Sequence, residues 1–245
     1  MERDFNYRPE AGAISNPGTM AFARAQSSFI NRVYGWMCGG LLLTAVISMW
    51  VVSTPKLMNV ILSNSILFIG LIILEFVIVG ALAFRINKIS AAAATAAYVA
   101  YAALNGLTLS VIFYHFTAES LATTFFATAG TFGVMSLYGY VTKRDLTSIG
   151  NLCFMMLIGV IIGSVINMFW SSSMLYWITT YVGIAVFVGL TAYDTQQIKE
   201  MSMAVDGIEQ SDSAKKYAIF GALRLYLDFI NLFLLLLRIF GGSRD

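Results

Sequence analysis

The chain has 245 residues, of which 58% are hydrophobic and 11% are charged, and its formal net charge is +2. Soluble domains carry about 25% charged residues, so this composition, with a mean hydropathy of +0.77, excludes a soluble globular protein. It favours an integral membrane bundle instead. The basic residues are scattered over short loops, so nucleic acid is not an expected partner.

The elements that the sequence predicts are a polar N-terminus followed by seven apolar segments, each long enough to span a bilayer. Residues 1–28 lack the short apolar core of a signal peptide, and we expect a disordered cytosolic tail there. Residues 29–245 are predicted to form one all-α integral membrane domain with seven transmembrane helices. These helices are expected at residues 33–53, 61–84, 89–114, 121–141, 152–170, 174–198 and 217–240.

The distribution of basic residues predicts the topology. Eleven Lys and Arg residues lie at the N-terminal side and in every second loop, and three lie on the opposite side. Because cytosolic loops are enriched in Lys and Arg, the N-terminus is expected in the cytosol. Seven full crossings place the C-terminus outside, whereas a re-entrant last segment would return Arg238 and Arg244 to the cytosol. We prefer a full crossing, because nothing between Leu225 and Phe240 breaks the helix.

Two carboxylates, Asp194 and Asp228, lie within the last two apolar segments. A charge in hydrocarbon costs at least a few kcal/mol, and such residues usually face the bundle interior. We therefore expect the two acids to face each other and to share one proton. Half-protonated, the pair would clamp two helices together; deprotonated, it would repel itself and offer oxygen ligands suited to Ca²⁺.

The neighbours of the acids leave alternatives open. Arg224 and Asn231 share a helix face with Asp228, so Arg224 could neutralise Asp228 while a hydroxyl such as that of Tyr193 satisfies Asp194. The predicted helix ends place Asp194 and Asp228 at different depths, which a water-filled vestibule reaching Arg224 would reconcile.

Glu75 falls near the middle of the second predicted helix. It is a candidate for lining an ion pathway together with Asn231. A protonated glutamate that is hydrogen-bonded to a serine or to a backbone carbonyl is the alternative.

Three motifs resemble those of the Bax inhibitor family, and most closely its bacterial inner-membrane branch. They are GLTAYDTQQ at residues 189–197, LYLDFINLF at 225–233 followed by LLRIFG at 236–241, and SLYGYVTKRD at 136–145. The resemblance covers nearly everything after Arg24. It implies a bundle in which the last helix is central. Together with the lack of a targeting signal it indicates a bacterial inner membrane, where the full crossing preferred above places the C-terminus in the periplasm.

The resemblance also implies a function, a pH-sensitive Ca²⁺ leak. In it Asp194 and Asp228 are the sensor and the transient Ca²⁺ ligands, and a basic residue matched to Arg85 latches the closed state. The sequence departs from the family at Arg224, where a small or hydroxyl residue is expected. A cation at that position would alter the pH response.

We expect no enzyme and no cofactor, with Ca²⁺ as the permeating ion and the bilayer, Ca²⁺ and protons as partners. A regulatory membrane protein that acts through protein partners is the main alternative. An intramembrane aspartyl protease would also need two acids, but Leu225-Tyr226-Leu227 precedes Asp228 where presenilin-like proteases have glycine. A proton-coupled transporter of a small solute would use the same acids.

Overall fold

The computed structural model describes residues 17–204 and 212–242, which form eight α-helices and no β-strand. Seven of these helices are long and apolar enough to cross a membrane, which confirms the all-α, seven-span prediction. The remaining one, α2, has nine residues and is too short to span. The helices are α1 Pro17–Val52, α2 Pro55–Ser63, α3 Ser65–Arg85, α4 Ala91–His115, α5 Ala118–Val141, α6 Thr147–Trp170, α7 Ser173–Ala204 and α8 Asp212–Phe240.

Several helices extend beyond the apolar runs that predicted them. Helix α1 begins at Pro17, a residue that the first turn of a helix tolerates well. Residues 17–28 are therefore helical, which corrects the predicted tail; residues 1–16 lie outside the described residues. Helix α7 likewise continues to Ala204, and α8 begins at Asp212. The polar loop that was predicted between them is shorter than expected.

Helix ends are set by polar side chains that satisfy free backbone groups. The side chains of Asn64, Ser90 and Thr117 accept hydrogen bonds from the backbone at the starts of α3, α4 and α5. Ser171 adopts the left-handed conformation, with φ of 49°, at the tight connection between α6 and α7. The Asn167 side chain accepts a hydrogen bond from the Ser172 amide there, at 2.7 Å. These caps let antiparallel spans follow one another with very short loops.

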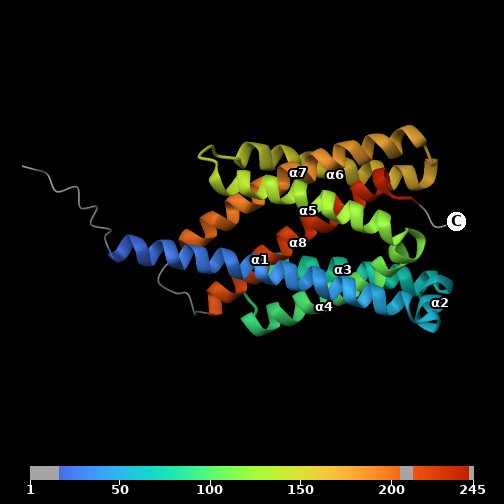
Figure 1. The fold of residues 1–245 in the computed structure, drawn as a ribbon, viewed down its shortest axis with the longest axis horizontal. Coiled ribbons are helices and arrows are strands. Elements are labelled where there is room, and N and C mark those ends of the chain that lie inside the picture. The colour runs from blue at the N-terminus through green and yellow to red at the C-terminus, as the bar shows by residue number, and fades with distance from the viewer. Residues whose placement is uncertain (1–16, 205–211, 243–245) are drawn as a thin grey trace, which may run out of the picture.

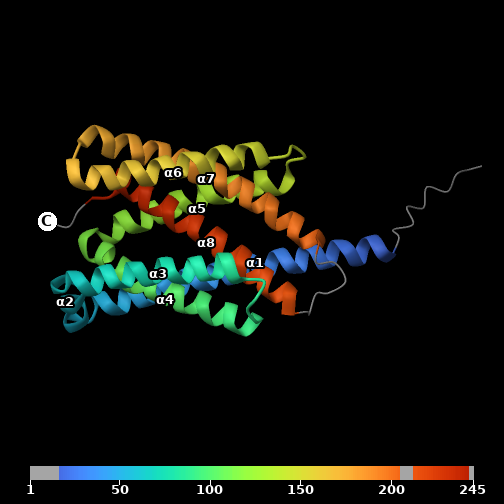
Figure 2. The ribbon, with the colours of Figure 1, turned by 180° about the vertical axis from the view of Figure 1, so that it is seen from behind.

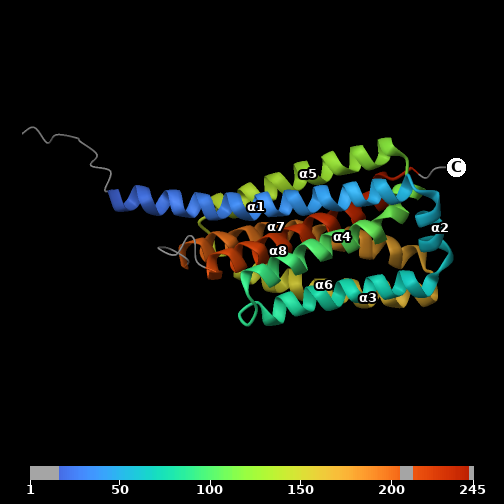
Figure 3. The same cartoon turned by 90° about the horizontal axis from the view of Figure 1, so that it is seen from below.

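Helix α8 is the inner helix of the described bundle. Two-thirds (67%) of its most apolar stretch is buried, against 6% for α3 and for α6. It packs against α1, α4, α5 and α7, and it crosses obliquely between the group α5, α6 and α7 and the group α1, α3 and α4 (Figures 1 and 2). Figure 3 shows it between α5 on one side and α3 on the other. Residues on α8 therefore face protein on most sides, whereas α3 and α6 present apolar side chains outward.

Helix α8 runs the length of the bundle without a break. Its 29 residues correspond to about 43 Å at 1.5 Å per residue, more than the roughly 30 Å of a bilayer core. The end of α8 lies at the end of the bundle opposite the start of α1 (Figure 1). This geometry agrees with a full crossing by the last helix and not with a re-entrant segment.

Close contacts with α5 and α6 position the part of α7 that precedes Asp194. A Cβ atom added to Gly139 of α5 would collide with the backbone of Ala192, and one added to Gly150 of α6 would lie 2.6 Å from the ring of Tyr193. Small residues of this kind allow helices to approach closely in a membrane. Both contacts involve residues directly preceding Asp194, so they hold α7 in place where the predicted site lies.

Candidate functional site

An ion pair between α7 and α8 forms the centre of the candidate site. The Arg224 guanidinium donates two hydrogen bonds to Asp194, with Nη2 2.5 Å from Oδ1 and Nε 3.1 Å from Oδ2. The Asp194 side chain is 9% exposed and that of Arg224 is 26% exposed. Arg224 also lies over the ring of Tyr193, with Cζ 5.9 Å from the centroid. A bidentate pair of this kind fixes both the position and the orientation of the two groups.

This pairing differs from the one that sequence spacing suggested. Arg224 reaches across to Asp194 on α7 instead of along its own helix to Asp228, and Tyr193 contacts the guanidinium. The longer helices explain why. Asp194 lies ten residues before Ala204, and Arg224 lies twelve residues after Asp212, which places them about 15 Å and about 18 Å from their helix ends. Asp194 and Arg224 therefore lie at similar depths, whereas Asp228, sixteen residues after Asp212, lies about 24 Å from its helix end. The difference in depth between the two aspartates that suggested a vestibule remains.

Asp228 lies one turn deeper than Arg224 and is almost fully buried, with 4% of its surface exposed. Its Oδ2 atom has no hydrogen-bond partner among the described residues. Asp228 interacts electrostatically with Asp194 and Arg224, and with the buried thiol of Cys153 on α6. The two aspartates thus interact electrostatically, and that they face each other and share one proton stays a prediction. No hydrogen bond joins Asp194 to Asp228 among the described residues, and each Asp194 oxygen accepts one hydrogen bond from Arg224.

A chain of hydroxyl groups beside Asp194 was not identified from the sequence. Thr195 donates a hydrogen bond to the carbonyl of Thr191 at 2.8 Å, so it can only accept from Ser136 of α5, whose Oγ lies 3.0 Å away. Ser136 in turn accepts from the Tyr34 hydroxyl of α1. The chain links α1, α5 and α7. Its members lie more than 50 residues apart in sequence, so no local pattern could have paired them.

Glu75 belongs to a second polar cluster, between α3 and α4. It accepts a hydrogen bond of 2.8 Å from the Thr108 hydroxyl, so its partner is a threonine and not the serine or backbone carbonyl that was considered. One turn away on α4, Asn105 donates to the Tyr101 hydroxyl at 2.9 Å, while its Oδ1 has no partner among the described residues. Glu75 interacts electrostatically with Tyr101 and with Tyr226 of α8.

The remaining predicted residues lie outside the ion pair. Asn231 donates to the Leu227 carbonyl of its own helix at 2.8 Å. Arg85 is exposed at the end of α3, and no ion pair joins it to either aspartate among the described residues. Residues 17–204 and 212–242 also contain no group of three His, Cys, Asp or Glu side chains that could hold a metal ion. Asp194 and Asp228 thus remain two carboxylates without a third such ligand.

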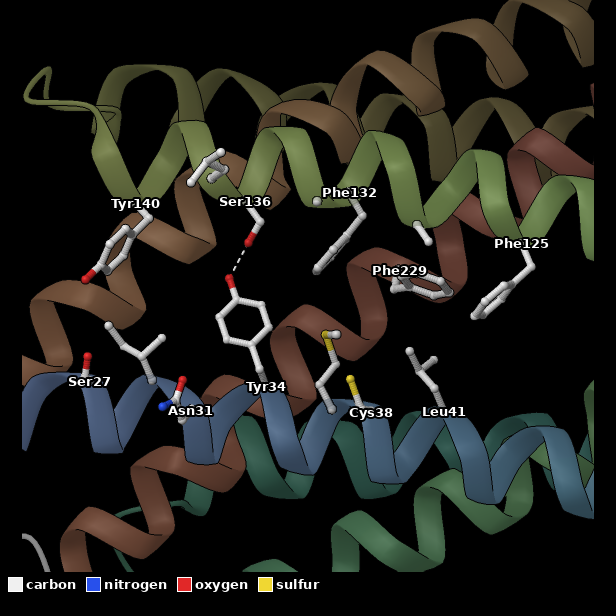
Figure 4. Close-up of a pocket in the computed structure, with 15 residues that line it drawn as sticks. Ser27, Asn31, Tyr34, Cys38, Leu41, Phe125, Phe132, Ser136, Tyr140 and Phe229 are labelled. Carbon is white, nitrogen blue, oxygen red and sulfur yellow. Dashed lines mark hydrogen bonds between the residues drawn. The ribbon is translucent and has the colours of Figure 1, made fainter.

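A cavity of about 630 Å³ lies beside this site, between α1 and α5 (Figure 4). Tyr34 and Ser136 form part of its wall, and Phe229 of α8 lies at its base. Asp194, Arg224 and Asp228 do not line it. It is therefore a separate feature, which adjoins the site through Phe229, the residue after Asp228, and through Ser136, which is hydrogen-bonded to Thr195.

Comparisons with known proteins identify relatives along almost the whole chain. A family model described as "Inhibitor of apoptosis-promoting Bax1" matches residues 26–245. The chain is 51% identical over 217 residues to the inner membrane protein YbhL of Escherichia coli K12, covering 89% of this chain and 92% of that protein. An uncharacterized protein of Borreliella burgdorferi is 42% identical over 90% of this chain and 94% of its own length. An uncharacterized membrane protein of Streptococcus pyogenes is 35% identical over 89% and 93%.

Proposed function

The chain belongs to the Bax inhibitor family, and we propose that it is a pH-sensitive leak for Ca²⁺ and other cations, gated by the protonation of Asp194 and Asp228. One observation supports this proposal most strongly. Asp228 is buried, with an unpartnered oxygen, one turn from a guanidinium already bound by another carboxylate. A buried polar atom without a partner is costly, so the packed arrangement is suited to a protonated Asp228.

The charges of the three residues set the direction of the pH response. When Asp228 is protonated, the three residues together carry no net charge, because the positive charge of Arg224 cancels the negative charge of Asp194. Ionisation of Asp228 leaves one uncompensated negative charge in the bundle interior, where burial is expensive unless the charge is paired. The packed, closed arrangement is therefore favoured at low pH, and opening is favoured as the pH rises.

Opening would also create a site for the permeating ion. When both aspartates are ionised and separate, their oxygens are hard ligands of the kind that Ca²⁺ prefers. A Ca²⁺ ion bound there would replace the proton that neutralised Asp228 in the closed arrangement. No resident cofactor is needed, and Ca²⁺ acts as cargo.

We further propose the orientation that the charge distribution predicts, with the N-terminus in the cytosol and the C-terminus in the periplasm. The chain is an integral membrane protein similar to a bacterial inner membrane protein, which is consistent with that arrangement. In this orientation the α7–α8 connection lies at the cytosolic surface. A permeating ion coming from the cytosol would then reach the Asp194–Arg224 pair first and Glu75 deeper in the pathway.

Regulation through a protein partner is the second candidate, because the matching family model is described as an inhibitor of another protein. The intramembrane protease has less support. Aspartic proteases need two carboxyl groups that share one proton, whereas both oxygens of Asp194 are bonded to Arg224.

Calcium flux into liposomes that contain only the purified protein tests the proposal. We expect flux to rise from mildly acidic to mildly alkaline pH, and Asp228→Asn, which resembles the protonated acid, to keep flux low at every pH. Asp145→Asn is the matched control, because Asp145 lies in the exposed connection between α5 and α6. Absence of flux above that of empty liposomes would refute the leak and favour action through a partner.

A further inference from the structure

The cavity between α1 and α5 is an apolar groove that opens toward the surrounding membrane. Its wall includes Leu41 of α1 and Phe125, Gly133 and Leu137 of α5, and the Leu137 side chain is 64% exposed. A Cβ atom added to Gly133 would meet no atom within 4 Å. An open, apolar space of this size within the membrane-spanning part of a protein is suited to a hydrocarbon chain.

The two ends of the groove differ in polarity. Ser27, Asn31 and Tyr140 lie at one end, and Leu41 and Phe125 lie at the other (Figure 4). Along α1 the groove extends from Ser27 to Leu41, which is about 21 Å at 1.5 Å per residue. One leaflet of a bilayer core is about 15 Å thick, half of the whole core. The groove therefore has the length for one acyl chain with its headgroup at the polar end.

Basic residues surround that polar end. Lys199 of α7 donates a hydrogen bond of 2.8 Å to the carbonyl of Tyr140 and lies 5.2 Å from the centre of its ring. Arg24 is exposed and lies one turn before Ser27 on the same face of α1. Lys143 is exposed just beyond the end of α5. Glu200, the neighbour of Lys199, carries one carboxylate, which accepts a hydrogen bond from Gln197. Arg24, Lys143 and Lys199 together outnumber it.

We propose that the groove between α1 and α5 binds an anionic phospholipid, with one acyl chain along Leu41 and Gly133 and the phosphate beside Arg24 and Lys199. Basic pockets between transmembrane helices recognise anionic headgroups in this way. The bound chain lies against the Tyr34–Ser136 hydrogen bond, and Ser136 is in turn hydrogen-bonded to Thr195, the residue next to Asp194. The site is independent of ion permeation and stands even if the protein moves no ions.

Native mass spectrometry tests the proposal on full-length protein released from nanodiscs that contain equal amounts of phosphatidylglycerol and phosphatidylcholine. We expect retained adducts of phosphatidylglycerol. Gly133→Leu fills the groove and should abolish them. Gly130→Leu is the matched control, because Gly130 is also exposed on α5 with open space around it but does not line the groove; it should retain the lipid.

A second pair of variants tests the headgroup without altering the groove. Arg24→Gln combined with Lys199→Gln should lose the preference for phosphatidylglycerol, whereas Lys88→Gln, an exposed residue in the α3–α4 connection, should keep it. Equal retention of phosphatidylcholine by the wild type would overturn the assignment of an anionic lipid. Retention of phosphatidylglycerol by Gly133→Leu, or its equal loss from Gly130→Leu, would overturn the assignment to the groove.

Discussion

Replacing Arg224 should destabilise the bundle more than replacing its partner Asp194. Arg224→Gln leaves a buried carboxylate, 9% exposed, without a counter-ion. Removing one partner of a buried ion pair costs about 3–5 kcal/mol. Because the guanidinium is 26% exposed, solvent already weakens the pair, and we expect the free energy of unfolding to fall by about 2–4 kcal/mol.

Asp194→Asn should cost less, for a reason specific to this site. Asp228 lies one turn from Arg224 on the same helix face, so the freed guanidinium can turn to it. The lost charged hydrogen bonds are then partly replaced, and we expect a loss of about 1–2 kcal/mol. The double variant should be less destabilised than the sum of the single variants, by about 1–2 kcal/mol.

Reversible unfolding in mixed micelles of a mild detergent and dodecyl sulfate would measure these three free energies. Arg238→Gln is the control, because Arg238 is also on α8 but forms no ion pair among the described residues; it contacts Thr180, at 3.4 Å, and the ring of Tyr176. Equal losses for Arg224→Gln and Asp194→Asn would show that Asp228 cannot replace Asp194. Additive losses, within about 0.5 kcal/mol, would show that the ion pair contributes nothing to stability.

Three further predictions concern other parts of the chain. Gly139→Leu should prevent folding or force α5 away from α7, because the added side chain collides with the backbone of Ala192; thermal unfolding would detect this. Thr108→Val removes the hydroxyl that Glu75 accepts from and should cost about 1–3 kcal/mol in unfolding free energy. Hydrogen bonds from Thr147 hold the pKa of Asp145 below its ordinary 3.8. The ionised Asp145 therefore stabilises the fold at neutral pH, and this stabilisation is lost as the pH falls through the lowered pKa. Acid unfolding curves of Asp145→Ala should lack this part of the pH dependence.

The number of spans was predictable from the sequence, whereas the ends of several helices were not. Apolar runs identify only the stretch of helix that lies in hydrocarbon. Residues 199–204 and 212–216 include several charged side chains, so hydropathy assigned them to a loop, although they belong to α7 and α8. This error changed both predicted depths by a similar amount, so the difference in depth between Asp194 and Asp228 is about the same with the observed helix ends.

The residues of the site were predictable, but their pairing was not. Charged residues in apolar segments stand out in any sequence, so Asp194, Arg224 and Asp228 were all identified. Spacing along one helix predicts only contacts within that helix. It suggested that Arg224 pairs with Asp228, whereas the partner lies on α7. The groove between α1 and α5 depends on contacts between distant segments, and nothing local in either segment predicts it.

In the proposed function, a single guanidinium beside two carboxylates would link proton binding to calcium binding. Arg224 binds both oxygens of Asp194, so Asp228 must be neutralised by a proton or by a cation from outside. If a proton and Ca²⁺ bind to the same oxygens of Asp228, the binding of each lowers the affinity for the other by the same factor. Raising the Ca²⁺ concentration should therefore shift the midpoint of Asp228 protonation to lower pH.

Infrared difference spectroscopy can follow this midpoint through the carbonyl stretch of the protonated acid, assigned by its absence in Asp228→Asn. Asp145→Asn should leave the band and its Ca²⁺ dependence unchanged. A midpoint that does not move with Ca²⁺ would mean that the proton and the ion bind at different places. Asp228 would then be a pH sensor that the permeating ion never touches, and the ligands for Ca²⁺ would have to be sought elsewhere, with the Glu75 and Asn105 cluster as the next candidate.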